Sequence, residues 1–343
     1  MAKIYKCSNC GGDMQFDPDK GLLVCGHCGN TETPEQYNES NSSEEDNKKD
    51  VEGVMQYKCP SCGAELVTDS YTAATKCTYC DSPIILEDRL SNQFKPDCLI
   101  PFKYNRNDTL KKIKEWCKNG LFTPNDFLSE NNLQKLAGIY VPFWLYGFET
   151  NIKMSAKCTK IKVYTEGDTE YTATYHYIVE RDVDGSFNRV PADASIKMDD
   201  ELMYLIEPFD YQELVEFEMP YLSGYMAEKY NYTASDLVER VRERVDKYAY
   251  DLTKETMDEY STVTVLDSRV ESTPSTKEYA MLPVWMYNYT YKGKDYTFVM
   301  NGQTGKINGR PPVSVSRVII VFLTTLIAIF GLISVIMMYL GGL

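Results

Sequence analysis

The most continuous hydrophobic segment of the sequence lies at its carboxyl-terminal end. Residues 318–340 contain no charged side chain, and at roughly 1.5 Å of rise per residue a helix of this length crosses a bilayer core. A buried core helix rarely runs so far without a polar face, so we predict a single transmembrane helix. Thr324, Ala328 and Gly331 form a stripe that would suit contact with another membrane protein, although ordinary composition accounts for it equally well.

Basic residues flank this segment on one side only. Lys306, Arg310 and Arg317 precede it, and no basic residue follows it. The positive-inside rule then places the amino-terminal body in the cytoplasm and the carboxyl terminus outside the plasma membrane. We therefore expect a single-pass, tail-anchored protein with the lipid bilayer as one of its partners.

The helical pattern recurs in two stretches of the middle region. One is NDTLKKIKEWCKNG, which we expect to be capped near Asp108 and to end at Gly120. The other is TASDLVERVRERVDKYAYDL, which begins with a capping box formed by Thr233 and Asp236. The residues expected to share the buried face of this second helix are Val238, Val241, Val245, Tyr248 and Leu252.

The strand pattern appears between and after these helices. Residues 163–190 predict two strands joined by short turns, and residues 286–300 predict a tyrosine-rich hairpin. Helices and strands mix without regular alternation over residues 96–310, which predicts a body of the α+β class. With the terminal span, the architecture expected of residues 96–343 is a mixed α+β body followed by one transmembrane helix.

One aromatic phrase occurs twice in the body. VPFWLY at Val141–Tyr146 resembles LPVWMY at Leu282–Tyr287. The two copies are either related core strands or an aromatic docking surface. Large aromatic side chains dominate small cores, so we favour core strands.

Eight of the eleven cysteines fall into two sets with identical spacing. In each set C-x2-C is followed, after fourteen residues, by a second C-x2-C. Such pairs can close a tetrahedron of thiolates around zinc, and the closed shell makes each of the two expected Zn²⁺ ions structural rather than catalytic. No apolar signal-peptide core follows Met1–Cys7, so we expect a reducing compartment and metal binding rather than disulfides. The expected ligands are Cys7, Cys10, Cys25 and Cys28 in the first set and Cys59, Cys62, Cys77 and Cys80 in the second.

These cysteines define two modules and a linker. We predict one zinc ribbon over residues 1–30 and another over 57–85, each too small to fold without its metal ion. The segment 31–56 between them contains NESNSSEEDNKKD, which is typical of an acidic flexible linker. His27 lies within the first set, but four thiolates already complete the shell, so we expect it to be a bystander.

Charge and composition argue against nucleic acid and against catalysis. The net charge is -14, spread over modules and body, and no basic aromatic stripe is apparent, so protein partners are favoured over nucleic acid. His27 and His176 are the only histidines, and NGQTGK at 301–306 lacks the spacing of a phosphate loop. Cys98, Cys117 and Cys158 lie outside the metal sets and are expected to behave as small hydrophobic residues. We therefore predict a protein that is not an enzyme.

The tandem cysteine sets, the terminal span and the body segment LPVWMYNYTYKGKDYTFVMNGQTGKI together resemble a known group. The chain is similar, over most of its length, to bacterial TFIIB-type zinc ribbon-containing membrane proteins, mainly of Firmicutes. Members of that group resemble the membrane partner of phage-shock-type coat proteins and flotillin-like proteins. The resemblance implies an anchor that recruits cytoplasmic proteins during membrane stress. The alternative function is that of a membrane-tethered nucleic-acid-binding protein.

Overall fold

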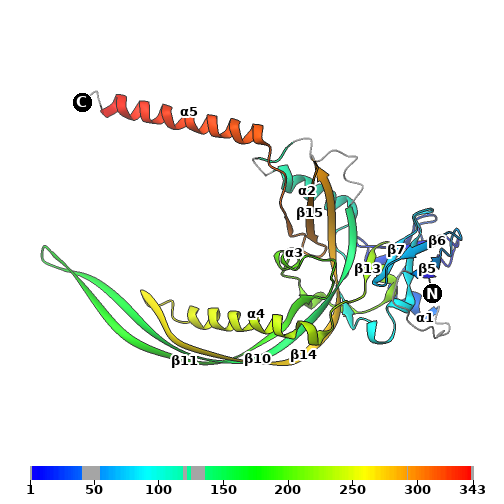
Figure 1. The fold of residues 1–343 in the computed structure, drawn as a ribbon, viewed down its shortest axis with the longest axis horizontal. Coiled ribbons are helices and arrows are strands. Elements are labelled where there is room, and N and C mark those ends of the chain that lie inside the picture. The colour runs from blue at the N-terminus through cyan, green and yellow to red at the C-terminus, as the bar shows by residue number, and fades with distance from the viewer. Residues whose placement is uncertain (1, 41–54, 119–121, 125–135, 292, 341–343) are drawn as a thin grey trace.

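The computed structural model describes residues 2–40, 55–118, 122–124, 136–291 and 293–340 (Figure 1). Long curved strands form the centre of the molecule, the amino-terminal modules lie at one side, and the carboxyl-terminal helix α5 (Val315–Leu340) projects away from the body. The main sheet has eleven strands, and smaller sheets of three and two strands lie in the modules. Strands and helices thus mix without regular alternation, which confirms the α+β class.

Three very long strands dominate the main sheet. β10 (Leu136–Glu166) lies between β11 (Thr169–Asp193) and β14 (Thr262–Tyr291) and pairs antiparallel with both. The predicted strands over 163–190 correspond to the last residues of β10 and most of β11, and Gly167 lies in the turn between them at φ 64°. The sequence pattern underestimated the length of these strands. Their inner ends are buried on both faces of the sheet, and the alternation of polar and apolar residues disappears there.

The predicted hairpin over 286–300 is confirmed by pairing of β14 with β15 (Lys294–Asn301). The remaining strands are shorter. In the modules they are β1 (Ala2–Lys3), β2 (Met14–Asp17), β3 (Leu22–Cys25), β4 (Thr31–Glu32), β5 (Met55–Lys58), β6 (Glu65–Thr68), β7 (Thr72–Lys76) and β8 (Pro83–Leu86); in the body they are β9 (Cys98–Leu99), β12 (Val215–Glu216), β13 (Met226–Glu228) and β16 (Ile307–Gly309).

The helices besides α5 cover the sheet or connect its strands. They are α1 (Pro34–Ser40), α2 (Arg106–Lys118), α3 (Asp200–Leu205) and α4 (Ala234–Glu255), with the 3-10 helices η1 (Glu87–Arg89), η2 (Asn92–Phe94), η5 (Tyr211–Glu213) and η6 (Met219–Leu222). α2 begins before its predicted start, because the Asn105 side chain accepts a hydrogen bond from Asp108 N–H at 2.8 Å and so provides the cap. Its predicted end at Gly120 lies outside the described residues.

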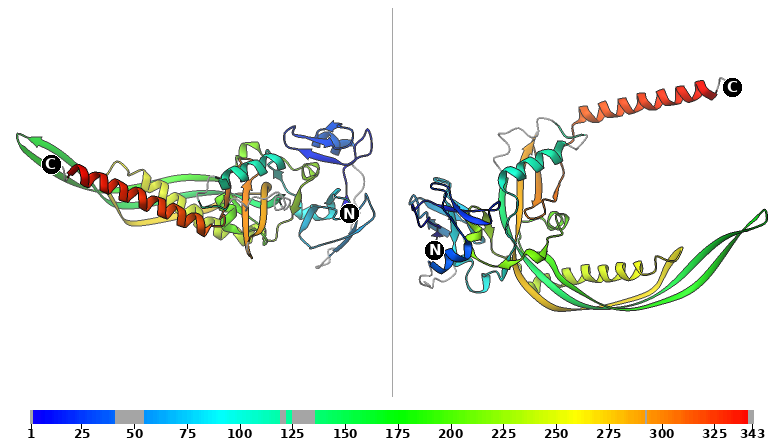
Figure 2. Two further views of the ribbon diagram at one scale, coloured as in Figure 1. Left: turned by 90° about the horizontal axis from the view of Figure 1, so that it is seen from above. Right: turned by 180° about the vertical axis from the view of Figure 1, so that it is seen from behind.

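The long helix α4 packs in the concavity of the curved sheet (Figures 1 and 2). Its capping box of Thr233 and Asp236 is confirmed. The predicted buried face was wrong at Tyr248 and Leu252, which are 39% and 54% exposed. The buried positions instead recur every four residues along most of the helix. Because this spacing exceeds 3.6 residues, the apolar stripe turns gradually around the helix as it follows the curved sheet. The buried residues are Ala234, Leu237, Val241, Val245, Ala249 and Thr253.

The repeated aromatic phrase forms part of the core. Its two copies lie on neighbouring antiparallel strands, with Val141 opposite Leu282. Trp285 is 5% exposed and donates a hydrogen bond to Tyr104 O at 3.0 Å, while the half-buried Trp144 donates to Tyr232 O at 2.9 Å. The interpretation as core strands is therefore confirmed, and each indole N–H has the partner that a buried tryptophan needs.

The second cysteine module is part of the body's sheet. Its strand β7 pairs with β13, its strand β8 pairs with β1, and β13 in turn pairs with β10. An ion pair network adds to this connection: Lys197 Nζ lies 2.7 Å from Asp69 and 2.9 Å from Glu228. Against the cost of burial, Lys197 and the N–H groups of Tyr71 and Thr72 lower the pKa of Asp69 to about 2.

The first module packs directly against η6. The Phe16 and Tyr221 rings lie 5.0 Å apart, and Ser223 Oγ donates to Met14 O at 2.6 Å. Residues 31–40, which the sequence assigns to a flexible linker, form β4 and α1, and Tyr221 OH donates to Glu35 at 2.9 Å. That prediction was wrong at this end because α1 gains tertiary contacts that local composition does not reveal; residues 41–54 lie outside the described residues.

Candidate metal centres

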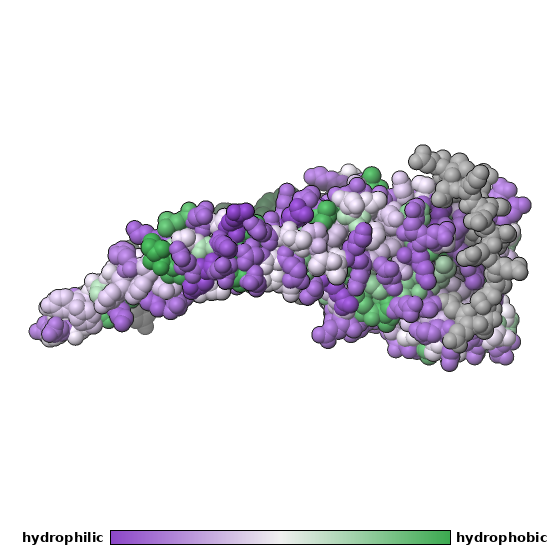
Figure 3. Space-filling model, turned by 90° about the horizontal axis from the view of Figure 1, so that it is seen from below, coloured by the Kyte–Doolittle hydropathy of each residue, from purple (hydrophilic) through white to green (hydrophobic). Residues whose placement is uncertain are grey.

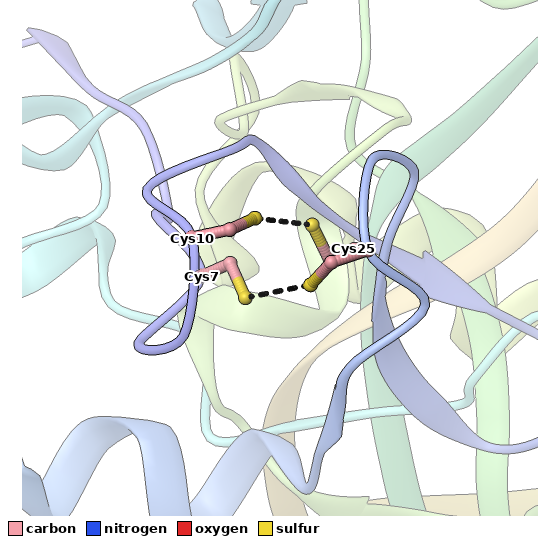
Figure 4. Close-up of side chains that lie close together, drawn as sticks. Cys7, Cys10 and Cys25 are labelled. Carbon is pink, nitrogen blue, oxygen red and sulfur yellow. Dashed lines mark hydrogen bonds between the residues drawn. The ribbon is translucent and has the colours of Figure 1, made fainter.

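Each cysteine set brings four sulfur atoms together, and within each set they all lie within 4.8 Å of one another. In the first set the Cys7–Cys28 and Cys10–Cys25 Sγ atoms are 3.6 and 3.5 Å apart, and Figure 4 shows labelled side chains of this set turned toward a common space. In the second set the closest Sγ pairs, Cys59–Cys80 and Cys62–Cys77, are 3.7 and 3.8 Å apart.

These separations test whether a metal ion fits. Tetrahedral Zn–S bonds of about 2.3 Å place sulfur atoms about 3.8 Å apart, whereas a disulfide needs about 2.05 Å. The observed Sγ–Sγ separations match those around a tetrahedral zinc ion and are too long for disulfide bonds. Both groups can therefore hold a metal ion, and four soft thiolates suit zinc.

The same turn presents every cysteine pair. The first cysteine of each pair donates its N–H to the residue five positions later and accepts a hydrogen bond from the residue four positions later. For Cys7 these partners are Gly12 at 2.7 Å and Gly11 at 2.9 Å. The residue four positions after the first cysteine has a positive φ in all four turns; these residues are Gly11, Gly29, Gly63 and Asp81. Asp81 is tolerated because short polar side chains enter this region more readily than most.

We expect Gly29→Ala to weaken Zn²⁺ binding at the first set roughly fivefold, from a backbone strain of about 1 kcal/mol. A Cβ at Gly29 would meet no atom within 4 Å, so the effect isolates its φ of 75°. Gly26→Ala is the matched control, since Gly26 also has open space but no positive φ. Competition with a chromophoric chelator measures both affinities, and equal effects of the two changes would contradict the explanation.

Hydrogen bonds to sulfur favour the ligating thiolate form and lower the pKa of Cys7 and Cys25 in the first set and of Cys80 in the second. Burial opposes ionisation of Cys7, but the N–H groups of Asn9 and Cys10 lower the pKa of this thiol to about 6. The Ser82 hydroxyl and N–H lower the pKa of Cys80, also to about 6. Such donors stabilise negative charge on sulfur, as they do around bound metal ions.

Other candidate residues lie apart from these centres. His27 is exposed and does not belong to the four-sulfur group, as expected of a bystander, and His176 is exposed on β11. Burial raises the pKa of the Cys117 thiol to about 11, and burial together with Glu278 and Asp97 raises that of Cys98 to about 12. Cys158 is fully buried in a hydrophobic cluster that includes Met257, just beyond the end of α4.

The NGQTGK segment repeats the cysteine turn without cysteine. Asn301 donates its N–H to Lys306 O and accepts from Gly305 N–H, both at 2.9 Å, and Gly305 has a φ of 75°. The Asn301 side-chain oxygen takes the place of sulfur by accepting the N–H groups of Gln303 and Thr304, each at 2.9 Å. Strand β16 follows this turn, whereas a helix follows a phosphate loop.

We expect Asn301→Ala to lower the free energy of unfolding by about 3 kcal/mol, since Asn301 is fully buried and its partners would lose their hydrogen bonds. Its side-chain nitrogen also donates to Ile206 O at 3.0 Å. The exposed Thr304 in the same turn gives the control Thr304→Ala, which should cost much less. Urea unfolding of the detergent-solubilised protein measures both, and similar losses would refute the role of the asparagine.

Comparison with known proteins gives one relative along nearly the full length. The uncharacterized protein YdjG of Bacillus subtilis (strain 168) is 37% identical to the chain over 321 residues, which cover 93% of the chain and 92% of YdjG. The chain belongs to the YdjG family. Because the match covers nearly all of both proteins, the YdjG relationship concerns the whole architecture rather than one module. No protein-family model and no solved structure matches the chain.

Proposed function

We propose that this YdjG-family chain is a non-enzymatic, membrane-anchored scaffold whose cytoplasmic zinc ribbons and body bind protein partners. The observation that carries the proposal is α5, a candidate membrane-spanning helix of which no part of the apolar window is buried. A fully exposed apolar helix of this length is unfavourable in water and favourable in a bilayer. The basic residues before α5 support a cytoplasmic body and an external carboxyl terminus.

The metal centres support a structural role for zinc. Four thiolates per group leave no open position for water or substrate. The paired hairpins and the shared turn geometry are those expected of zinc ribbons. In the second module, β7, which ends just before Cys77, joins the module to the body through β13. The three thiols outside the metal groups are buried or half-buried. Their limited access to solvent favours a binding protein over an enzyme with a cysteine nucleophile.

Local charge supports protein rather than nucleic acid as the partner. A cleft of about 850 Å³ is lined by residues of the first module, the second module and the body. Its lining includes the carboxylates of Asp13, Asp17 and Asp19, the cationic side chains of Lys76 and Arg106, and His27. Lys6, beside the first metal group, forms an ion pair with Asp13. Phosphate binding requires an uncompensated positive groove, which this cleft is not.

The resemblance to the membrane partner of phage-shock-type and flotillin-like proteins supports a place in the membrane-stress response. We expect such cytoplasmic proteins to co-purify with the full-length protein from detergent-solubilised membranes. Tyr79 is 75% exposed between Cys77 and Cys80, so Tyr79→Ala should reduce recovery without releasing metal, while Tyr248→Ala on α4 should not. Recovery that is unchanged, together with micromolar or tighter DNA binding at about 0.15 M salt, would favour the nucleic-acid function instead.

A further inference from the structure

A carboxyl group is buried at the point where β11, α3 and α4 meet. Asp193 is the last residue of β11 and is 0% exposed, with Phe143 of β10 opposite it. Its Oδ2 atom has no hydrogen-bond partner in the described part of the chain. Ionisation of such a group is costly, because burial removes the water that would stabilise its charge. Asp193 therefore needs either a close counter-ion or a proton of its own.

Arg240 of α4 is the cation beside Asp193, but its closest hydrogen bonds go to other groups. Its Nη1 donates to the Asp200 carboxylate of α3, and its Nη2 donates to the backbone carbonyl of Asp193 at 3.0 Å. The Asp193 carboxylate lies 3.5 Å from Nη2, and Arg240 Nε, which could complete a two-point bond to a carboxylate, has no partner among the described residues. One guanidinium thus faces two carboxyl groups and is closely bonded to Asp200 alone.

The neighbouring ionisable groups do not supply a second counter-ion. Arg244 of α4 forms its own ion pair with Glu207 at 2.6 Å. The Tyr204 ring of α3 lies near both guanidinium groups, with its centre 5.8 Å from Arg240 Cζ and 4.5 Å from Arg244 Cζ, and burial raises the pKa of its phenol. The site is therefore neutral when Asp193 is protonated and carries an uncompensated negative charge when Asp193 is ionised.

A proton on Asp193 accounts for its unpartnered oxygen. Two ionised carboxylates can only accept hydrogen bonds, whereas a protonated Asp193 can donate one to the Asp200 carboxylate. Burial and this neighbouring carboxylate raise the pKa of Asp193 to about 8, and the attraction of Arg240 opposes them. Like charges that share one site have this effect generally, because both groups cannot ionise at low cost. We therefore expect Asp193 to keep its proton at neutral pH.

The helix α3 connects this carboxyl pair with the segment that leads to α5. Ile206 O, directly after α3, accepts from Asn301 Nδ2 at 3.0 Å, and Glu207 O accepts from Lys306 Nζ. Lys306 precedes β16, and α5 begins at Val315. α3 and α4 lie on the concave side of the curved strands (Figures 1 and 2), whereas Figure 3 shows the molecule from below, with hydrophobic patches scattered among polar residues. The attachment of α3 thus affects the base of α5.

We propose that a proton held between Asp193 and Asp200 fastens α3 to β11 and α4, and that loss of this proton as the pH rises releases α3 and loosens its contacts at the base of α5. We call Asp193, Asp200 and Arg240 the proton latch. Its action is a property of the body alone and does not depend on which partner the proposed scaffold binds.

The direction of the pH dependence follows from proton binding. When α3 opens, Asp193 meets water and regains the pKa of an ordinary aspartate, about 3.9. Because its pKa in the closed state is about 8, the closed state binds more protons than the open state between these two values. The closed state is therefore most favoured in acid, and this advantage is lost as the pH rises to about 8.

Hydrogen exchange of the full-length protein in detergent, corrected for the intrinsic exchange rate at each pH, measures the release of α3. We expect the protection factors of residues 202–207 to fall about fiftyfold between about pH 6 and about pH 8. Those of residues 152–158 in β10 should stay constant. Asp193→Asn should remove the pH dependence and keep α3 protected, because its amide donates to Asp200 at every pH as the protonated acid does.

Two further variants separate the proton from simple packing. Asp200→Asn removes the neighbouring negative charge and should move the midpoint of the change to lower pH. Glu207→Gln is the matched control, since Glu207 belongs to the same interface but has Arg244 as its own counter-ion; it should lower protection equally at both pH values.

Three results would overturn the proton latch. They are wild-type protection that does not change with pH, a pH dependence that survives in Asp193→Asn, and one that disappears in Glu207→Gln. Should Asp193→Asn fail to fold, an unshifted midpoint in Asp200→Asn overturns the proposal in its place.

Discussion

Replacing Cys77 by serine is expected to reduce bound zinc from two ions to one and to open the edge of the main sheet. Cys77 directly follows β7, and β7 pairs with β13, which pairs with β10. Zinc binding contributes about 10–16 kcal/mol to the folding of isolated zinc-finger modules, so three remaining thiolates cannot keep this segment ordered. The damage should therefore extend beyond residues 57–85 into β13.

Elemental analysis and hydrogen exchange measure the two parts of this expectation. Amides of residues 226–228 should exchange faster in Cys77→Ser, while those in the middle of β10 and β14 should stay protected. Cys98→Ser is the control, since Cys98 lies outside both groups and should leave two ions bound. A variant that retains two ions, or that loses one with unchanged exchange in β13, would contradict the structural connection.

The corresponding change in the first module, Cys25→Ser, should disturb a different part of the structure. Cys25 closes β3, and the module shares a hydrophobic cluster with Tyr221 and Leu222 of η6. Cys25→Ser should release one ion and expose η6 while β13 remains protected. The modules are thus expected to lose their structure separately, but neither should behave as an independent domain on a flexible linker.

Removal of residues 313–343 is expected to move the protein completely from the membrane fraction to the soluble fraction. The deleted segment contains α5, whose large apolar side chains are exposed along its length. Burying such a helix in hydrocarbon is strongly favourable, and no other candidate span occurs in the described part of the chain. Fractionation of cells that express full-length and shortened protein measures the shift.

A point substitution in α5 tests membrane insertion without removing any residues. Ile327→Arg places a charge near the middle of α5 at a cost of about 2.5–3.5 kcal/mol, so it should impair insertion, whereas Ile327→Leu should not. Protease added to intact cells should leave the full-length body undigested. Digestion of the body without lysis would show that it lies outside, and a shortened protein that remains in the membrane would show that α5 is not the anchor.

Local features of the chain were predictable because their causes lie within a few residues. Cysteine spacing identified the two groups of four sulfurs, since each pair occupies one tight turn and each hairpin brings two turns together. The charge-free segment identified α5, and the Thr233–Asp236 capping box identified the start of α4. The resemblance to zinc-ribbon membrane proteins agrees with both cysteine groups and with the terminal helix.

Features that depend on distant contacts were not predictable. The sequence alone determined which residues could bind metal, which segment could span a membrane and where strong helix signals begin. Only the tertiary structure decided that β7 and β13 join the second module to the body, that α1 packs beside η6, and that the stripe on α4 follows a curved sheet rather than a straight helix axis. The reason is physical: ligand spacing, hydropathy and capping act between near neighbours, whereas strand register and module docking depend on surfaces that meet only after the chain has folded.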